Sequence, residues 1–193
     1  MASEVSIVST AFVILGKHAI NAFDENNNTH IAARTMYKIV KENLLYKTPW
    51  SFAKESEQLT LLAGAPEVTR WAYAFLMPTV PEKIYLFRPD PVCDYEIFEN
   101  KIFTNVNQLR FDYTYDVSEA AFPGYFTNAM CYSLAAELTM TITQNVQLAQ
   151  LNFKKAQMHI MNAMAVGASE QPNYMIARDK LFASRYVGIS RAY

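Results

Sequence analysis

The sequence has few of the residues that build metal sites and redox centres. Its two cysteines, Cys93 and Cys131, are not part of a CxxC pair, and its three histidines stand far apart without an HExxH motif. Structural zinc sites need four Cys or His ligands at short, regular spacing, so this composition excludes them. We expect reduced thiols and no bound metal.

Glycine is also scarce, with only five in 193 residues. Neither GxGxxG nor GxSxG occurs, and Gly16-Lys17 lacks the upstream glycine and the following Ser or Thr of a phosphate loop. Acidic pairs such as Glu55/Glu57 and Asp112/Asp116 have no nucleophile or orienting base nearby in the pattern. The sequence therefore predicts no cofactor and no catalytic centre.

An excess of positive charge is missing too, since the formal net charge is −1. Proteins that grip duplex DNA by neutralising phosphates usually carry a clear excess of Lys and Arg. No apolar run reaches the length of about 20 residues that spans a bilayer, and the start lacks the basic region of a secretory signal. We expect neither specific DNA binding nor a membrane-spanning segment.

What the chain does contain is apolar and aromatic residues. Hydrophobic residues make up 51% and charged residues 18%, and there are 12 Tyr and 12 Phe. This is enough to build a core, and the length suits one domain spanning residues 1–193. Tyrosine also favours surfaces that become buried on assembly, because its ring is apolar while its hydroxyl keeps a polar partner.

Helical spacing appears at both ends of the chain. The first segment, from about Glu4 to Leu15, has apolar residues at i, i+4 and i+7, and Gly16 suits a left-handed cap. A second helix is predicted from His30 to Leu45. Together with the flanking residues these helices form a predicted helical part, residues 1–48.

The middle of the chain, residues 49–116, favours strands. Five prolines between Pro66 and Pro91 exclude long helices, and apolar residues alternate with polar ones in several short runs. Tyr95–Phe98 and Lys101–Thr104 flank Glu99-Asn100, which predicts a hairpin. The pattern indicates an inserted antiparallel β-sheet or small sandwich.

Helical spacing returns in residues 117–167. A break at Pro123-Gly124 precedes one helix, and a second helix runs from about Gln144 to Val166. In this second helix Ala149, Phe153, Ala156 and Met161 form the predicted stripe. The two helices are expected to pair as an antiparallel hairpin, so the fold class is α+β. Residues 168–193 form an extended C-terminal arm whose many aromatics favour ordering on a partner, or packing on the chain's own domain.

Four sequence motifs, in this order, resemble a known family. They are Ile14-Leu15-Gly16-Lys17-His18-Ala19-Ile20, Trp50-Ser51-Phe52-Ala53, Trp71-Ala72-Tyr73-Ala74-Phe75-Leu76-Met77-Pro78, and Phe122-Pro123 followed by Leu134-Ala135-Ala136-Glu137-Leu138. The chain resembles the tail tubular protein A, or head-to-tail connector adaptor, family of short-tailed bacteriophages. Ala19 stands where the family often has proline, and Thr79-Val80 where an aspartate is usual. The resemblance extends from about Val5 to Arg185.

The resemblance implies a structural virion protein and not an enzyme. Such adaptors form a homo-oligomeric ring, typically of twelve copies, between the portal protein and the tail nozzle or fibre proteins. The ring extends the DNA channel, contacts DNA non-specifically and helps retain the packaged genome. The implied location is the head–tail interface of a virion assembled in the host cytoplasm.

Candidate interface residues follow from this assignment, because aromatic and Arg side chains carry much interface energy. The portal-binding candidates in the arm are Tyr174, Arg178, Phe182, Arg185, Tyr186, Arg191 and Tyr193. The tail-side candidates in the sheet region are Phe87, Tyr95, Phe98 and Phe103, for which a core role is equally open.

Two alternative functions stay open. A tail terminator or head-completion protein of a long-tailed phage would share ring assembly but not this order of elements. A small cytosolic enzyme should show a pocket with convergent polar groups and behave as a monomer.

Overall fold

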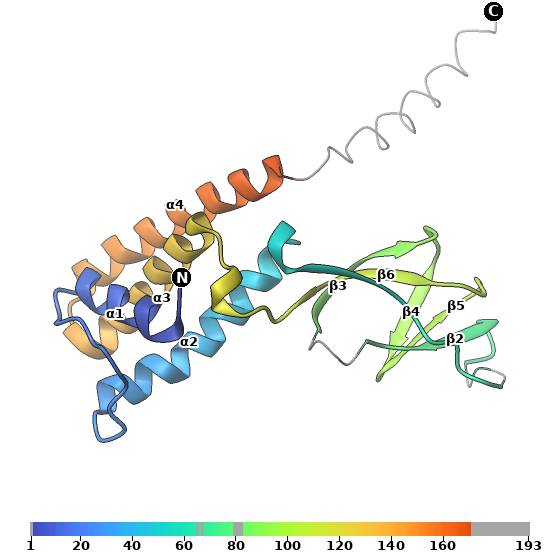
Figure 1. The fold of residues 1–193 in the computed structure, drawn as a ribbon, viewed down its shortest axis with the longest axis horizontal. Coiled ribbons are helices and arrows are strands. Elements are labelled where there is room, and N and C mark those ends of the chain that lie inside the picture. Colours follow the sequence, from blue (N-terminus) through green and yellow to red (C-terminus); the bar gives the residue numbers. More distant parts are fainter. Residues whose placement is uncertain (1, 65, 67, 79–82, 171–193) are drawn as a thin grey trace, which may run out of the picture.

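The computed structural model describes residues 2–64, 66, 68–78 and 83–170, without the side chains of Lys83, Ile84 and Phe87. Figure 1 shows the helices gathered at one end of the chain's fold and the strands at the other. The helices are α1 (Glu4–Ile14), α2 (Asn28–Lys47), α3 (Gly124–Thr143) and α4 (Val146–Ser169), with short 3₁₀ turns at Ser51–Ala53 and Glu119–Ala121. The strands are β1 (Lys54–Gln58), β2 (Tyr73–Leu76), β3 (Lys83–Asp90), β4 (Tyr95–Phe98), β5 (Lys101–Thr104) and β6 (Arg110–Tyr115). The predicted α+β class is confirmed.

Local capping chemistry sets the ends of the first helices. The Ser3 side chain accepts a hydrogen bond from the backbone N–H of Ser6 at the start of α1. Gly16 follows α1 with φ of 73°, the left-handed conformation expected from its position. Asn27 caps α2 by accepting from the backbone N–H of Thr29.

The later helices pair as the predicted hairpin. A two-residue connection separates them, with Gln144 in the left-handed region and Asn145 capping α4. Buried between the helices, the Asn152 side-chain amide donates to Thr139 Oγ1 at 3.0 Å, and that hydroxyl donates to the carbonyl of Ala135. A buried amide with a partner costs little, so this bond fixes the register of α3 against α4.

The predicted buried stripe of α4 is partly wrong. Asn152, Ala156, Ala163 and Gly167 are buried, whereas Phe153 and Met161 are 55% and 71% exposed. The helix also continues to Ser169, with Gly167 inside it instead of after its end. Small residues let α4 approach the bundle closely. Which face of α4 is buried depends on the elements it packs against, not on the spacing of its apolar residues.

The strands form two three-stranded antiparallel sheets, in the orders β1-β6-β3 and β2-β5-β4. The Tyr95–Thr104 hairpin is confirmed, with its turn at Glu99, where φ is 51°. Phe111 of the first sheet is buried together with Phe75 and Ile102 of the second. The two sheets thus share a core of their own, as in a small sandwich.

Two strand assignments differ from the sequence prediction. β1, with the polar sequence KESEQ, was not predicted and pairs along the edge of β6, with Lys54 opposite Thr114 and Gln58 opposite Arg110. The β-prone run of the sequence is Ile84–Phe87, whereas β3 continues to Asp90 and includes Pro89. Because β3 is an edge strand, a proline that lacks an N–H donor is tolerated there.

The helices enclose a second, larger core. Ile7 and Val8 of α1, Leu44 of α2 and Phe126 and Leu134 of α3 are almost fully buried in it. The described chain therefore has one apolar core in the helical part and one in the sheet part.

Candidate interaction surfaces

An ionic cluster joins the two parts of the fold. Lys41 of α2 places its Nζ 2.7 Å from Asp116 and 3.0 Å from Glu119, in the segment that follows β6. The Tyr37 hydroxyl donates to the same Glu119 carboxylate at 3.1 Å. The ammonium also lies 5.6 Å from the centre of the Phe122 ring. The Lys41 ammonium thus links α2 to the segment that follows β6.

The protonation of this cluster follows from its partners. Burial alone would lower the pKa of Lys41, but its hydrogen bonds to Asp116 and Glu119 raise it. Burial would raise the pKa of Glu119, but hydrogen bonds from its backbone, Lys41 and Tyr37 lower it. Burial and the Glu119 charge raise the pKa of Tyr37. The cluster is therefore an ion pair with a neutral phenol, a structural arrangement.

An aromatic cluster closes the end of the bundle nearest the sheets. Trp50 is fully buried, its ring is 5.1 Å from that of Phe126, and its Nε1 donates to the Leu44 carbonyl at 2.8 Å. Next to it, the Tyr125 hydroxyl donates to the Glu170 carboxylate at 3.0 Å, and Ser51 donates to the same carboxylate. These bonds fix the point at which the chain leaves α4.

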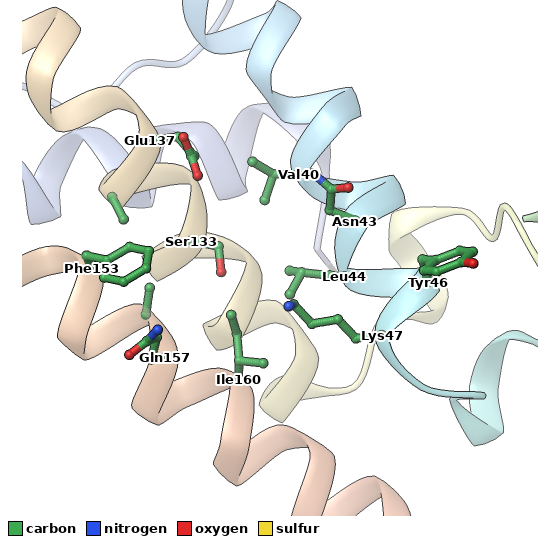
Figure 2. A pocket seen from close by; sticks show the side chains of 12 residues that line it. Val40, Asn43, Leu44, Tyr46, Lys47, Ser133, Glu137, Phe153, Gln157 and Ile160 are labelled. Carbon is green, nitrogen blue, oxygen red and sulfur yellow. The ribbon is translucent and has the colours of Figure 1, made fainter.

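A groove lies between α2 and α4, with α3 as its floor (Figure 2). Its cavity has a volume of about 390 Å³. The walls come from Leu44 and Val40 of α2 and from Phe153 and Ile160 of α4, and Ser133 and Glu137 point in from α3. Within the described part of the chain, the buried Ser133 Oγ has no hydrogen-bond partner. The lining is mixed, because Asn43, Lys47, Glu137 and Gln157 lie beside the apolar side chains, so the groove suits an amphipathic segment that offers polar contacts as well as an apolar face.

The solvent side of α4 carries several large apolar side chains among polar ones such as Gln150, Lys154 and Gln157. Its exposed large side chains include Leu151, Phe153, Met158 and Met161, all at least 49% exposed. The helix contains no Asp or Glu, and its only Lys residues are Lys154 and Lys155. Several exposed large apolar side chains on one helix are typical of an interaction site. The sequence alone indicates such a surface, because α4 has more large apolar residues than a single buried face can hold.

The four tail-side candidates have different positions. Phe98 is 43% exposed at the end of β4, and Tyr95 is half-buried with its ring 5.1 Å from that of Phe111. Phe103 is 2% exposed and belongs to the interior of the fold. Phe87 lies in β3, but its side chain is outside the described part. Of the three candidates whose side chains are described, Phe98 is the most exposed.

The portal-binding candidates all lie outside the described residues. These are Tyr174, Arg178, Phe182, Arg185, Tyr186, Arg191 and Tyr193. The structure locates their point of attachment, since the described chain ends at Glu170 beside Tyr125 and Ser51.

The histidines and cysteines have ordinary structural environments. His30 Nδ1 accepts from the Asp24 backbone N–H, His159 stacks on Tyr132 with centroids 3.9 Å apart, and His18 is exposed. Burial raises the pKa of Cys131 to about 11, which keeps it a thiol. Across the described ranges, no three His, Cys, Asp or Glu side chains come together as a metal site.

None of the helices in the described part of the chain is long and apolar enough to cross a membrane. No protein-family model matches the chain, and a search of curated proteins found no match either.

Proposed function

We propose that this chain is the ring-forming adaptor that joins a phage portal to the tail nozzle. The proposal starts from the four ordered sequence motifs that resemble the tail tubular protein A family. Two of these motifs lie at defined places in the fold: Trp50 is at the end of the bundle where the chain enters the sheets, and Leu134–Leu138 lies in α3. The partners would be further copies of the chain, a portal protein and the nozzle or fibre proteins, and the location would be the virion.

The observation that carries the proposal is the exposed apolar surface of α4. Leu151 and Met161 are 49% and 71% exposed although the bundle already has a complete buried core. A closed ring needs a heterologous interface, in which one surface of each copy covers a different surface of the next. The exposed apolar side chains of α4 would belong to one of these two surfaces. A net charge of −1 suits a channel wall past which DNA slides without being gripped.

The elongated arrangement also supports the proposal (Figure 1). The helical part and the sheet part have separate cores and lie at opposite ends, so each can present its own surface to a different neighbour. In this assignment the helical part and residues 168–193 contact the portal, and Phe98 of the sheet part lies toward the next tail component.

The test is electron microscopy with light scattering, on the protein alone and mixed with the portal protein encoded in the same genome. We expect rings stacked coaxially on the portal, and weaker docking after deletion of residues 171–193. Met161→Glu should disrupt rings, whereas Val13→Glu, a change at a 56% exposed position on α1, should not. A chain that stays monomeric and ignores the portal at high concentration would contradict the proposal.

A further inference from the structure

The groove between α2, α3 and α4 has the form of a helix-binding site without its helix. Phe153 and Ile160 line one wall and Leu44 the other, and Phe153 leaves 55% of its surface exposed. The buried Ser133 Oγ on the floor has no partner among the described residues. Leaving a buried hydroxyl unpaired costs free energy, so an occupant with a polar atom at that point would be stabilised. Figure 2 shows these side chains converging on the same space.

The chain itself continues from the end of α4, the helix that forms one wall of this groove. The described residues end at Glu170, which Tyr125 and Ser51 hold at the end of α4, and 23 residues follow. From Ser169 back to Phe153 is about 24 Å along α4, at about 1.5 Å per residue. A helix of about 16 residues running back beside α4 would cover that length, so residues 171–193 are long enough.

The sequence of this segment suits a turn followed by such a helix. Pro172 disfavours helix at Gln171, and Asn173 is a good cap for a helix that starts after it. Met175, Phe182, Tyr186, Ile189 and Tyr193 then follow at spacings of seven, four, three and four residues. This spacing places them along one face of a helix. A helix that follows its neighbour after a short connection packs antiparallel to it.

Charge favours the same pairing. Residues 171–193 contain four basic residues and one acidic residue, so their formal charge is +3. The rest of the chain has a formal charge of −4, which gives the net charge of −1. The groove itself is lined by one acidic and one basic residue, Glu137 and Lys47, so the charge attraction comes from the rest of the chain and not from the groove alone. A tethered segment also acts at an effective concentration on the order of millimolar, which a separate partner rarely reaches.

We propose that residues 171–193 fold back as a helix into the α2–α3–α4 groove of the same chain. Phe182 and Tyr186 then pack against Phe153 and Ile160, and the arm is stored on its own subunit. This storage does not depend on the adaptor function. If that function holds, the portal competes with the groove for the same aromatic side chains, and docking releases the arm.

The test is amide hydrogen exchange, read by mass spectrometry, on the full chain without any portal. Peptides within residues 174–190 should exchange at least about 10-fold more slowly than the same synthetic peptide free in solution. Phe153→Glu should abolish this protection. Val13→Glu is the matched control, because Val13 is 56% exposed on α1, and it should leave the protection intact.

Three outcomes would overturn the proposal. Exchange of the arm at the free-peptide rate would show that it does not dock. Protection unchanged by Phe153→Glu would place the arm elsewhere on the chain. Protection that disappears on 10-fold dilution would mean that the groove belongs to a second copy. Circular dichroism melts of both variants would check that the bundle is still folded, and the portal experiment remains a separate test.

Discussion

The Nζ of Lys41, on α2, lies 2.7 Å from Oδ1 of Asp116, the first residue after β6. The side chain of Lys41 is only 11% exposed, and Glu119 completes the cluster at 3.0 Å. The helical and sheet parts have separate cores, and the contacts that connect them include the Tyr46 ring of α2, 4.9 Å from the Tyr85 ring of β3. The ion pair adds a polar contact that helps to fix one part of the fold relative to the other.

Replacing the cation should weaken that connection. Lys41→Met leaves Asp116 and Glu119 close together without their cation, although Glu119 keeps the hydrogen bond from Tyr37, and we expect a loss of about 2 kcal/mol in the free energy of unfolding. Urea denaturation measures it. Lys38→Met is the control, because Lys38 forms only an exposed pair with Glu42 at 3.9 Å, and it should change stability by less than about 0.5 kcal/mol. Equal effects for the two variants would contradict a structural role for Lys41.

The same cluster predicts a dependence of stability on pH. The pKa of Glu119 is lowered in the folded chain, so its contribution is present above its unfolded pKa near 4.5 and is lost as the pH falls through the folded value. The pKa of Lys41 is raised, so its contribution is present below about 10.5 and is lost as the pH rises through the folded value. Glu119→Gln should flatten the acid side of the stability curve, measured by urea denaturation between pH 3 and 6. Glu25→Gln, at an exposed loop position, should leave that side unchanged.

Gly167 should not accept a side chain. A Cβ at this position would lie 3.2 Å from Trp50 Cε3, and the Trp50 ring is held by Phe126 and by its bond to Leu44. Gly167→Ala gains about 1 kcal/mol of helix propensity, but crowding a packed ring costs about 1–3 kcal/mol. We expect a net loss of about 1 kcal/mol in thermal or urea unfolding. Gly124→Ala, where a Cβ meets nothing within 4 Å, should be neutral or slightly stabilising. Stabilisation by Gly167→Ala would show that Trp50 moves.

The buried bond between Asn152 and Thr139 should hold the α3–α4 hairpin. Asn152→Ala removes this bond and leaves a small cavity, and we expect destabilisation of about 2 kcal/mol. Asn162→Ala on the exposed side of the same helix should gain a few tenths of a kcal/mol from helix propensity. Differential scanning calorimetry of the two variants separates the effect of the buried contact on stability from the effect of helix propensity. A similar shift in both would mean that the buried bond contributes nothing.

Features set by local chemistry could be predicted from the sequence. The Tyr95–Thr104 hairpin, the left-handed Gly16 after α1 and the start of α3 after Pro123 each depend on residues within a few positions of one another. Alternation, turn residues and prolines act over that range, whichever partner the element later meets.

The candidate interface residues were less predictable. Phe98 and Phe103 belong to the same hairpin and look alike in sequence, yet one is 43% exposed and the other 2%. The groove residue Phe153 was predicted to be buried and lies open. Whether an aromatic residue is core or surface depends on what packs over it, and that partner is distant in the chain.

The sequence by itself determined the four helices, the hairpin and the order in which the helical and strand regions follow one another. Only the tertiary structure decided that the polar segment Lys54–Gln58 is a strand, that small residues and Asn152 form the buried face of α4, and that Lys41 reaches Asp116. β1 needs the edge of β6 for its hydrogen bonds, α4 needs the surface of α3, and Lys41 needs a carboxylate 75 positions away in the chain. Each of these features is stabilised by a partner brought near only by folding, and no local pattern contains that information.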